Sequence, residues 1–327
     1  MTAGGGSLTL AGLGCSPLWL AAGYDRIACL EYLIHKLREY DQLESSLLHD
    51  ANDVGDTPFL AAASRGNIEA CKCLLRSVEE CRETTAANGR QPRCRGDDDE
   101  DYDCNLHQCS RWRRMKARII RTTNRVGDTP LQVAVASGHI ELVTLLLEVD
   151  DLCHDTAHDG DDTVEEEEYS KKCVDRKNES GLSPLIVACE RNLPSIVRTL
   201  LEHGADLHAR DARGRSALAV AAFCGCIDVV EYLLDCLDST TDGTSSSLLN
   251  APDRDGKTPL LLAARTGNLK MTKLLVDAGA DARIRDHGSL TLLDVAVKFK
   301  KENVIEYLSS CTPSSTTEIT DIIVTSS

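Results

Sequence analysis

One short pattern recurs seven times along this chain, and it limits what the chain can fold into. Each copy begins with a hydroxyl residue, usually continues with Pro-Leu, and ends in a run of small and apolar residues. The copies begin at Ser16, Thr57, Thr129, Ser183, Ser216, Thr258 and Thr291. Their second positions lie 33 residues apart between 184 and 217 and again between 259 and 292. A period of this length is typical of stacked repeats, so we expect a repeat array.

The clearest copy, residues 178–210, shows how local chemistry shapes one repeat. Gly181 can take the positive φ of a turn, and Ser183 precedes a proline in the usual order of helix cap and first helical residue. A second helix opens at Pro194, carries apolar residues at helical spacing, and closes before Gly204. One such unit cannot bury its apolar face alone, so stacked neighbours must share a core.

Two further positions recur with a structural purpose. An alanine at one place in the apolar run lets neighbouring helices approach closely, as at Ala21, Ala62, Ala134, Ala188, Ala221, Ala263 and Ala296. An Asx residue three positions before the turn glycine predicts a side-chain cap of the turn. It is found as Asn52, Asn124, Asn178, Asp211 and Asp253.

With turn, cap, helix pair and Gly-Ala-Asp return in order, the chain resembles the ankyrin-repeat family over about residues 12 to 310. The resemblance implies an all-α repeat solenoid of about seven helix-turn-helix repeats, with β-turn fingers and acidic or polar loop inserts. The family's usual histidine after Pro-Leu is replaced throughout, by Trp19, Leu60, Gln132, Ile186, Ala219, Leu261 and Asp294. This departure leaves open whether the hydrogen bonds of that histidine are made here.

The pattern also predicts the organisation of the chain. We expect a flexible N-terminus over 1–11, the array over 12–310, and a disordered Ser/Thr-rich tail over 311–327. Four inserts follow second helices and precede the next turn, at about 38–48, 79–118, 150–172 and 237–248. Because each insert has the same place in its repeat, all four are expected at one edge of the stack.

The largest insert is polarised by charge. An acidic run at 97–103 is followed by a basic run at 111–118, and the two signs balance over the insert. This composition favours a disordered loop that attracts itself. The alternative is a short basic helix over 111–118 that serves an acidic partner or nuclear import.

Two of the inserts contain residues of metal-ligating type. Zinc prefers about four nitrogen or sulfur ligands. The cysteines and histidine of the first insert fit no strong zinc spacing, and they are Cys94, Cys104, His107 and Cys109. The acids of the second insert match part of a calcium loop, with Asp155, Asp159, Gly160, Asp161 and Glu166 at the ligand or turn positions, but Ala157 breaks the pattern. We therefore expect no metal and no other cofactor.

Composition bounds the partners and the compartment. The net charge is −16, which argues against nucleic acid as the main partner. Many of the 15 cysteines fall in predicted helices, where a thiol acts as a small apolar residue. Reduced thiols fit the cytoplasm or the nucleus. No apolar run suits a membrane, and the apolar stretch at 8–23 is already explained in part by the first repeat.

The residues show no catalytic constellation, because no phosphate-binding glycine loop or nucleophile–base pair is recognisable. The favoured function is a protein–protein interaction module, a monomeric scaffold or adaptor without enzyme activity. The first alternative is a substrate-recognition adaptor of a ubiquitin ligase, which would need a second docking motif. The other is a metal-dependent enzyme that uses a site in an insert.

A partner protein is expected on the turns and first helices of the middle repeats. Charged and polar residues at these positions carry both signs, which predicts polar, salt-sensitive recognition. The candidate partner-binding residues are Arg125, Asp128, Gln132, Glu179, Arg213, Arg215, Arg254, Asp255 and Lys257.

Overall fold

The computed structural model describes residues 15–79, 104–154, 172–238 and 244–311. These residues form α-helices, one short 3-10 helix and connecting turns, and within them no strand is present. An isolated antiparallel bridge joins Arg210 and Ser216. The predicted all-α fold is therefore confirmed. The expected N-terminus, 1–11, lies outside the described residues, as does the expected tail, 311–327, apart from Cys311, which ends a helix.

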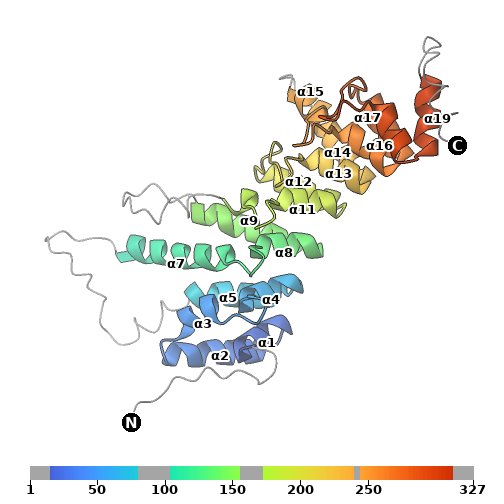
Figure 1. Cartoon of the computed structure of the whole chain (residues 1–327). Coiled ribbons are helices and arrows are strands. Elements are labelled where there is room, and N and C mark those ends of the chain that lie inside the picture. Colours follow the sequence, from blue (N-terminus) through green and yellow to red (C-terminus); the bar gives the residue numbers. More distant parts are fainter. Residues whose placement is uncertain (1–14, 80–103, 155–171, 239–243, 312–327) are drawn as a thin grey trace. The chain divides into compact units, whose positions relative to one another are not determined.

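The helices fall into two compact units, one of residues 1–188 and 195–206, the other of 189–194 and 207–327. In the first unit, the first helices of successive repeats lie beside one another and the second helices form a second layer (Figure 1). The pairs are α1 (Pro17–Gly23) with α2 (Ile27–Glu39), α4 (Pro58–Ser64) with α5 (Ile68–Glu79), α8 (Pro130–Ser137) with α9 (Ile140–His154), and α11 (Pro184–Glu190) with α12 (Pro194–Glu202).

The second unit repeats this arrangement. Its first helices α13 (Ala217–Cys224), α16 (Pro259–Thr266) and α18 (Leu292–Lys298) contact one another in sequence order. Their second helices are α14 (Ile227–Asp238), α17 (Leu269–Asp277) and α19 (Glu302–Cys311). The two units together contain the seven helix pairs that the seven sequence copies predict.

The first helices begin where the sequence predicts. The hydroxyl of Thr57 accepts a hydrogen bond from the backbone N–H of Leu60, and Pro58 occupies the first turn. Serine or threonine caps of the same kind precede α1, α8, α13, α16 and α18. Each cap satisfies one of the N–H groups that a helix start leaves unpaired. The recurring alanines are all buried, which permits the close approach of neighbouring helices.

Helices also form within or next to the regions expected as inserts. They are α3 (Leu43–His49), α7 (Cys104–Arg121), the 3-10 helix η2 (Cys173–Asp175) and α15 (Thr244–Leu249). Helix α7 spans the basic run at 111–118 and contacts α3, α5, α8 and α9. Its last turns bury Ala117, Ile119 and Ile120. Charge suggested a loop here, but these apolar residues hold the end of α7 within the stack.

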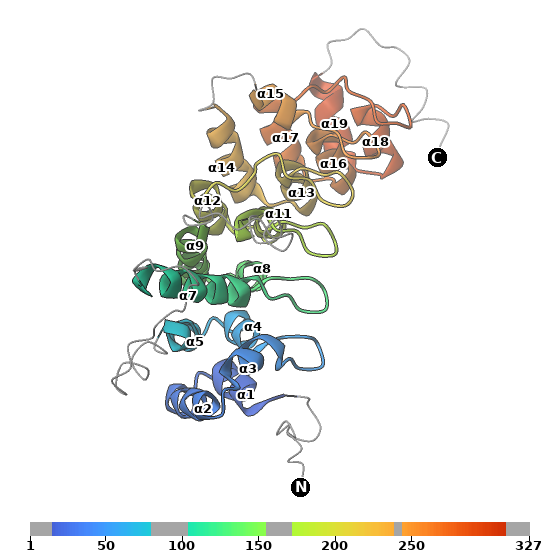
Figure 2. The same cartoon turned by 90° about the vertical axis from the view of Figure 1, so that its left-hand side faces the viewer.

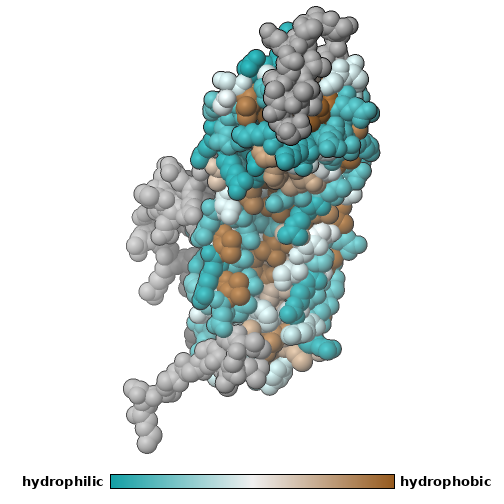
Figure 3. Space-filling model, turned by 45° about the vertical axis from the view of Figure 1, so that its right-hand side comes forward, coloured by the Kyte–Doolittle hydropathy of each residue, from teal (hydrophilic) through white to brown (hydrophobic). Residues whose placement is uncertain are grey.

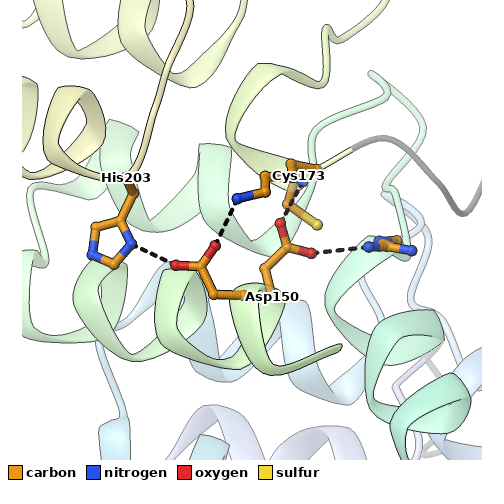
Figure 4. A network of polar contacts seen from close by, with 6 residues as sticks. Asp150, Cys173 and His203 are labelled. Carbon is orange, nitrogen blue, oxygen red and sulfur yellow. Dashed lines mark hydrogen bonds and ion pairs between the residues drawn. The ribbon is translucent and has the colours of Figure 1, made fainter. Parts of the chain in front are cut away.

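A polar network links η2 to the helices α7 and α9 (Figure 4). The carboxylate of Asp150 accepts a hydrogen bond from Arg121 at 3.0 Å and another from the backbone N–H of Cys173 at 2.6 Å. The adjacent Asp151 pairs with His203 at 2.9 Å and with Lys172 at 3.1 Å. Burial alone would raise the pKa of Asp151, but the hydrogen bonds from these two partners outweigh it and lower the pKa.

Candidate partner-binding surface

Each predicted turn forms a loop, here called a finger, that precedes a first helix. In the first unit the fingers before α4, α8 and α11 project on one side (Figure 2). In the first finger, Asn52 Oδ1 accepts hydrogen bonds from the backbone N–H groups of Val54 and Asp56 at 3.0 and 2.8 Å. The same pair of bonds recurs at each Asx position named above, which confirms the predicted caps.

The finger glycine is required by geometry as well as by φ. Gly55 has φ +85°, and a Cβ on it would lie 2.9 Å from the backbone nitrogen of Arg125 in the next finger. Any other residue would therefore be strained in its own backbone and would push the neighbouring finger away. Adjacent fingers consequently lie close enough to bond to each other.

Backbone hydrogen bonds join the fingertips of the first unit. The N–H of Arg125 donates to Val54 O at 3.2 Å, and the N–H of Glu179 donates to Val126 O at 3.1 Å. Because these bonds use only the backbone, the side chains of Arg125 and Glu179 remain exposed. Asp128 is half-buried and accepts a hydrogen bond from the asparagine of the next finger at 2.8 Å. Of the four partner-binding residues predicted in the first unit, Arg125 and Glu179 are therefore the two with exposed side chains.

The structure contradicts the prediction that Gln132 is exposed for partner binding. Its exposed fraction is 1%, so its side chain is buried. The amide oxygen accepts a hydrogen bond from the N–H of Thr129 at 2.9 Å and completes a capping box. The amide nitrogen donates to Leu182 O at 2.7 Å and to Arg176 O at 3.1 Å. Gln132 therefore links α8 to the following finger. In this repeat a glutamine makes hydrogen bonds at the position where the family usually has a histidine.

The fingertips of the second unit are linked in the same way. The N–H of Arg254 donates to Arg213 O at 3.0 Å, and the N–H of His287 donates to Asp255 O at 2.9 Å. The side chains of all four residues are exposed. Lys257 is half-buried and pairs with Asp255 at 2.5 Å. Of the residues predicted in this unit, Arg213 and Arg254 present exposed positive charges at the fingertips.

A row of alternating arginine and aromatic side chains follows the first helices of the second unit. Arg215 is bound to Asp211 at 2.7 Å and lies over the ring of Phe223 at 5.7 Å. Arg265 lies 5.9 Å from the centre of the same ring and 5.1 Å from that of Phe299. Such cation–π contacts hold arginine side chains in place without neutralising their charge. The guanidinium of Arg215 is therefore already engaged by Asp211 and Phe223, and it is less available to a partner.

The first unit has a smaller cluster of the same kind. Arg65 lies 4.3 Å from the ring centre of Tyr24 and 5.6 Å from that of Trp19, and it donates to Gly23 O at 2.8 Å. Sequence analysis missed both clusters because it weighed only fingers and helix starts. A signal was available, because aromatic or basic residues stand at the end of several of the apolar runs, as Tyr24, Arg65, Phe223, Arg265 and Phe299 do.

The surface is mixed in polarity and not uniformly charged. Figure 3 shows hydrophobic residues between hydrophilic ones on the face that it draws. Large apolar side chains with more than a third of their area exposed include Tyr24, Val54, Val126 and Phe299, which belong to the fingers and first-helix ends. Such a face can combine apolar contact with charge complementarity.

The candidate metal residues gain no support from the part of the chain described. Residues 94 and 155–166 lie outside it, as do the side chains of Cys104, His107 and Cys109. Among the described residues, no three His, Cys, Asp or Glu side chains are grouped to hold a metal ion. The described cysteines are not joined in disulfides, and burial raises the pKa of Cys71 to about 12. No helix within the described ranges is long and apolar enough to cross a bilayer.

A family model described as "Ankyrin repeats (3 copies)" matches residues 39–157, 102–211, 153–245 and 242–319. Among solved structures, the ankyrin repeat domain of Bcl-3, a member of the IkappaB protein family, has a TM-score of 0.58 to this chain at 22% identity. It covers 90% of this chain, and this chain covers 99% of it. At that identity the likeness supports the fold alone.

Curated relatives match parts of this chain. NF-kappa-B inhibitor alpha of Sus scrofa is 36% identical over 34% of this chain and 34% of its own length. The NF-kappa-B p105 subunit of Gallus gallus is 28% identical over 55% of this chain and 19% of its own. Tyrosine-protein kinase HTK16 of Hydra vulgaris is 30% identical over 43% and 18%. The chain thus spans about a third or less of these relatives.

Proposed function

The chain belongs to the ankyrin-repeat family, and from that premise we propose that it is a scaffold or adaptor that binds a partner protein on its fingers and first-helix ends. Ankyrin repeats are a protein–protein interaction fold and typically are not catalytic. The observation that carries the proposal is the row of fingertips within each unit, joined through backbone bonds that leave the tip side chains exposed. Because these bonds fix the backbone of the fingers, binding a partner need not order that backbone first, which lowers the entropy cost of binding.

The second unit favours a partner with an acidic patch. Arg213 and Arg254 are exposed at neighbouring fingertips, and Arg265 is held between two rings nearby along the first helices. Basic residues gathered on one face stand out in a chain of net charge −16. Recognition by exposed charges is screened by salt, so the association rate should fall as ionic strength rises.

The cellular setting is part of the proposal. Free thiols suit a reducing compartment, and one relative is named as a nuclear factor. We therefore place the protein in the cytoplasm, the nucleus or both, where it acts as a monomer.

The test is capture of partners from the native cell with charge-reversal variants. The double variant Arg213→Glu with Arg254→Glu changes two exposed fingertips and leaves the turn bonds of Asp211 and Asp253 intact. Lys270→Glu is the matched control, because Lys270 is exposed on the second helix α17. Proteins that bind the wild type and the control, but not the double variant, are the expected result.

Circular dichroism must show that the variants remain helical. If the same partners bind all three proteins with equal affinity, the binding surface lies elsewhere and the proposal fails. If they bind the wild type alone, charge on the second-helix side matters equally, which also contradicts it.

A further inference from the structure

Three arginines lie over aromatic rings within the described residues, and their guanidinium groups differ in what else they bind. Arg65 donates a hydrogen bond to Gly23 O at 2.8 Å. Arg215 donates to a carboxylate oxygen of Asp211 at 2.7 Å. In the described part of the chain, no hydrogen bond or ion pair engages the guanidinium of Arg265, and its nitrogens are not among the fully buried ones. Its N–H donors are therefore open to an acceptor from outside.

Two rings hold this guanidinium in place. Arg265 stands half-buried in the last turn of α16, 5.9 Å from the ring centre of Phe223 at the end of α13 and 5.1 Å from that of Phe299 after α18. Since α16 contacts both α13 and α18, rings from the two neighbouring repeats flank one guanidinium. The rings attract its charge, but they supply no oxygen acceptors for its N–H donors.

Basic residues lie around the exposed ring that follows α18. Lys298 and Lys300 are exposed and flank this ring in the sequence. A Cβ on Gly267 would lie 2.6 Å from the side chain of Lys301, so that lysine lies against the end of α16. The run from 298 to 302 contains one acid, Glu302. The local charge therefore favours the approach of an acidic group.

The acid that interacts with Arg265 at longer range already has a partner. Asp255 pairs with Lys257 at 2.5 Å. The hydrogen bond from Lys257 is the main cause that lowers the pKa of Asp255, and Arg265 adds to this lowering only through its charge. Asp255 therefore does not occupy the donors of Arg265.

The polarity of α16 offers a simpler account of Arg265. A basic side chain in the last turn stabilises the negative end of a helix. That account explains the charge, but an arginine without ring contacts would serve as well. The two rings that fix the guanidinium need a further reason.

We propose that Arg265, held between Phe223 and Phe299, binds the carboxylate of an aspartate or glutamate side chain in the partner protein, with a neighbouring apolar residue of the partner packed on Phe299. This inference rests on the proposed function and names the chemical group that this part of the surface recognises. The planar donors of a guanidinium match the two oxygens of a carboxylate. Arginine is also among the residues that most often dominate binding energy at interfaces.

The probe is a library of random short peptides displayed on phage and selected on the full chain. Selected peptides are synthesised with amidated carboxyl ends, so that only side chains supply carboxylates. Peptides with an acidic residue beside an apolar one should be enriched. Arg265→Gln should bind such a peptide about tenfold or more weakly in fluorescence anisotropy, because a charge-assisted hydrogen bond is lost.

Lys270→Gln is the matched control. It also removes one positive charge, but from the exposed surface of the second helix α17. This variant should bind the peptide as the wild type does. Phe299→Leu keeps an apolar side chain without the ring and should weaken binding several-fold. Circular dichroism must show that each variant remains helical.

A change in the peptide tests the same contact without altering the protein. Replacing its acid by the matching amide should weaken binding to the wild type by about tenfold as well. The same replacement should have little effect on binding to Arg265→Gln, because the carboxylate has already lost its partner.

Three outcomes would overturn the proposal. They are a selection without acidic peptides, equal binding by the wild type and Arg265→Gln, and tighter binding when phosphoserine replaces the acid, which would assign the site to phosphate. Any of these outcomes, combined with loss of cellular partners by the Arg213 and Arg254 double variant, would reject the carboxylate site and leave the proposed function standing.

Discussion

Helix α7 makes two ion pairs that separate the effect of distance from the effect of burial. Arg118 and Glu44 are 2.6 Å apart, with side-chain exposures of 40% and 48%. Arg121 and Asp150 are farther apart, at 3.0 Å, but their exposures are 5% and 3%. If the distance within the pair decides its contribution to stability, Glu44→Ala should lower the free energy of unfolding more than Asp150→Ala does. If burial decides it, Asp150→Ala should have the larger effect.

The magnitudes favour burial. An exposed pair contributes about 0–1 kcal/mol, because water and salt screen it and long side chains lose entropy. Removal of one partner of a buried pair costs about 3–5 kcal/mol, because the other charge stays buried without compensation. Asp150→Ala also leaves the backbone N–H of Cys173 without its acceptor. We therefore expect losses of about 4 kcal/mol for Asp150→Ala and under about 1 kcal/mol for Glu44→Ala.

The assay is urea denaturation followed by far-ultraviolet circular dichroism, with the wild type and both variants at the same pH and salt. Hydrogen exchange at α7 and η2 would show whether the loss is local, since repeat arrays can unfold in sections. The reasoning is refuted if Asp150→Ala costs less than 1 kcal/mol, or no more than Glu44→Ala does. The double variant Arg121→Met with Asp150→Leu should recover most of the loss, because it leaves no buried charge.

Two further predictions concern buried polar groups. Gln132→Ala should lower the free energy of unfolding by about 2–4 kcal/mol, because the buried partners of Gln132 lose their hydrogen bonds. Arg125 is exposed, so Arg125→Ala should change the free energy of unfolding by under about 0.5 kcal/mol. Similar losses for the two variants in urea denaturation would contradict this. Burial raises the pKa of Cys71 and of Cys173 to about 12. Above pH 9 the unfolded chain releases these thiol protons, whereas the folded chain keeps them. The free energy of unfolding should therefore be unaffected by these thiols below pH 9, and it should fall by about 1.4 kcal/mol per pH unit per thiol between pH 9 and pH 12. Cys71→Ala should show a shallower fall, and an unchanged slope would count against the argument.

The sequence alone determined the repeat architecture, because its signals are local. A hydroxyl cap, a proline in the first turn and an Asx residue before a finger glycine act within a few residues of one another. Their positions therefore predicted the starts of the first helices and the turns of the fingers. The recurring alanines predicted the close helix contacts, since only small side chains permit them.

Tertiary structure decided the features that depend on residues far apart in the chain. Residues 111–118 of α7 are mostly basic, but the adjacent Ile119 and Ile120 are buried because α7 packs against α9 and α5. Gln132 looked like an exposed polar residue until the following finger placed two carbonyl oxygens beside its amide.

A cavity in the first unit, lined by three arginines among other residues, is the clearest example. Its walls come from residues 48–49, 118–123 and 176, and no local pattern links those positions. Local chemistry fixes which helices form and where they begin. The burial of a charge, and the meeting of three arginines at one point, depend on the packing of separate segments. Such long-range contacts leave no recurring pattern in the sequence from which they could be recognised.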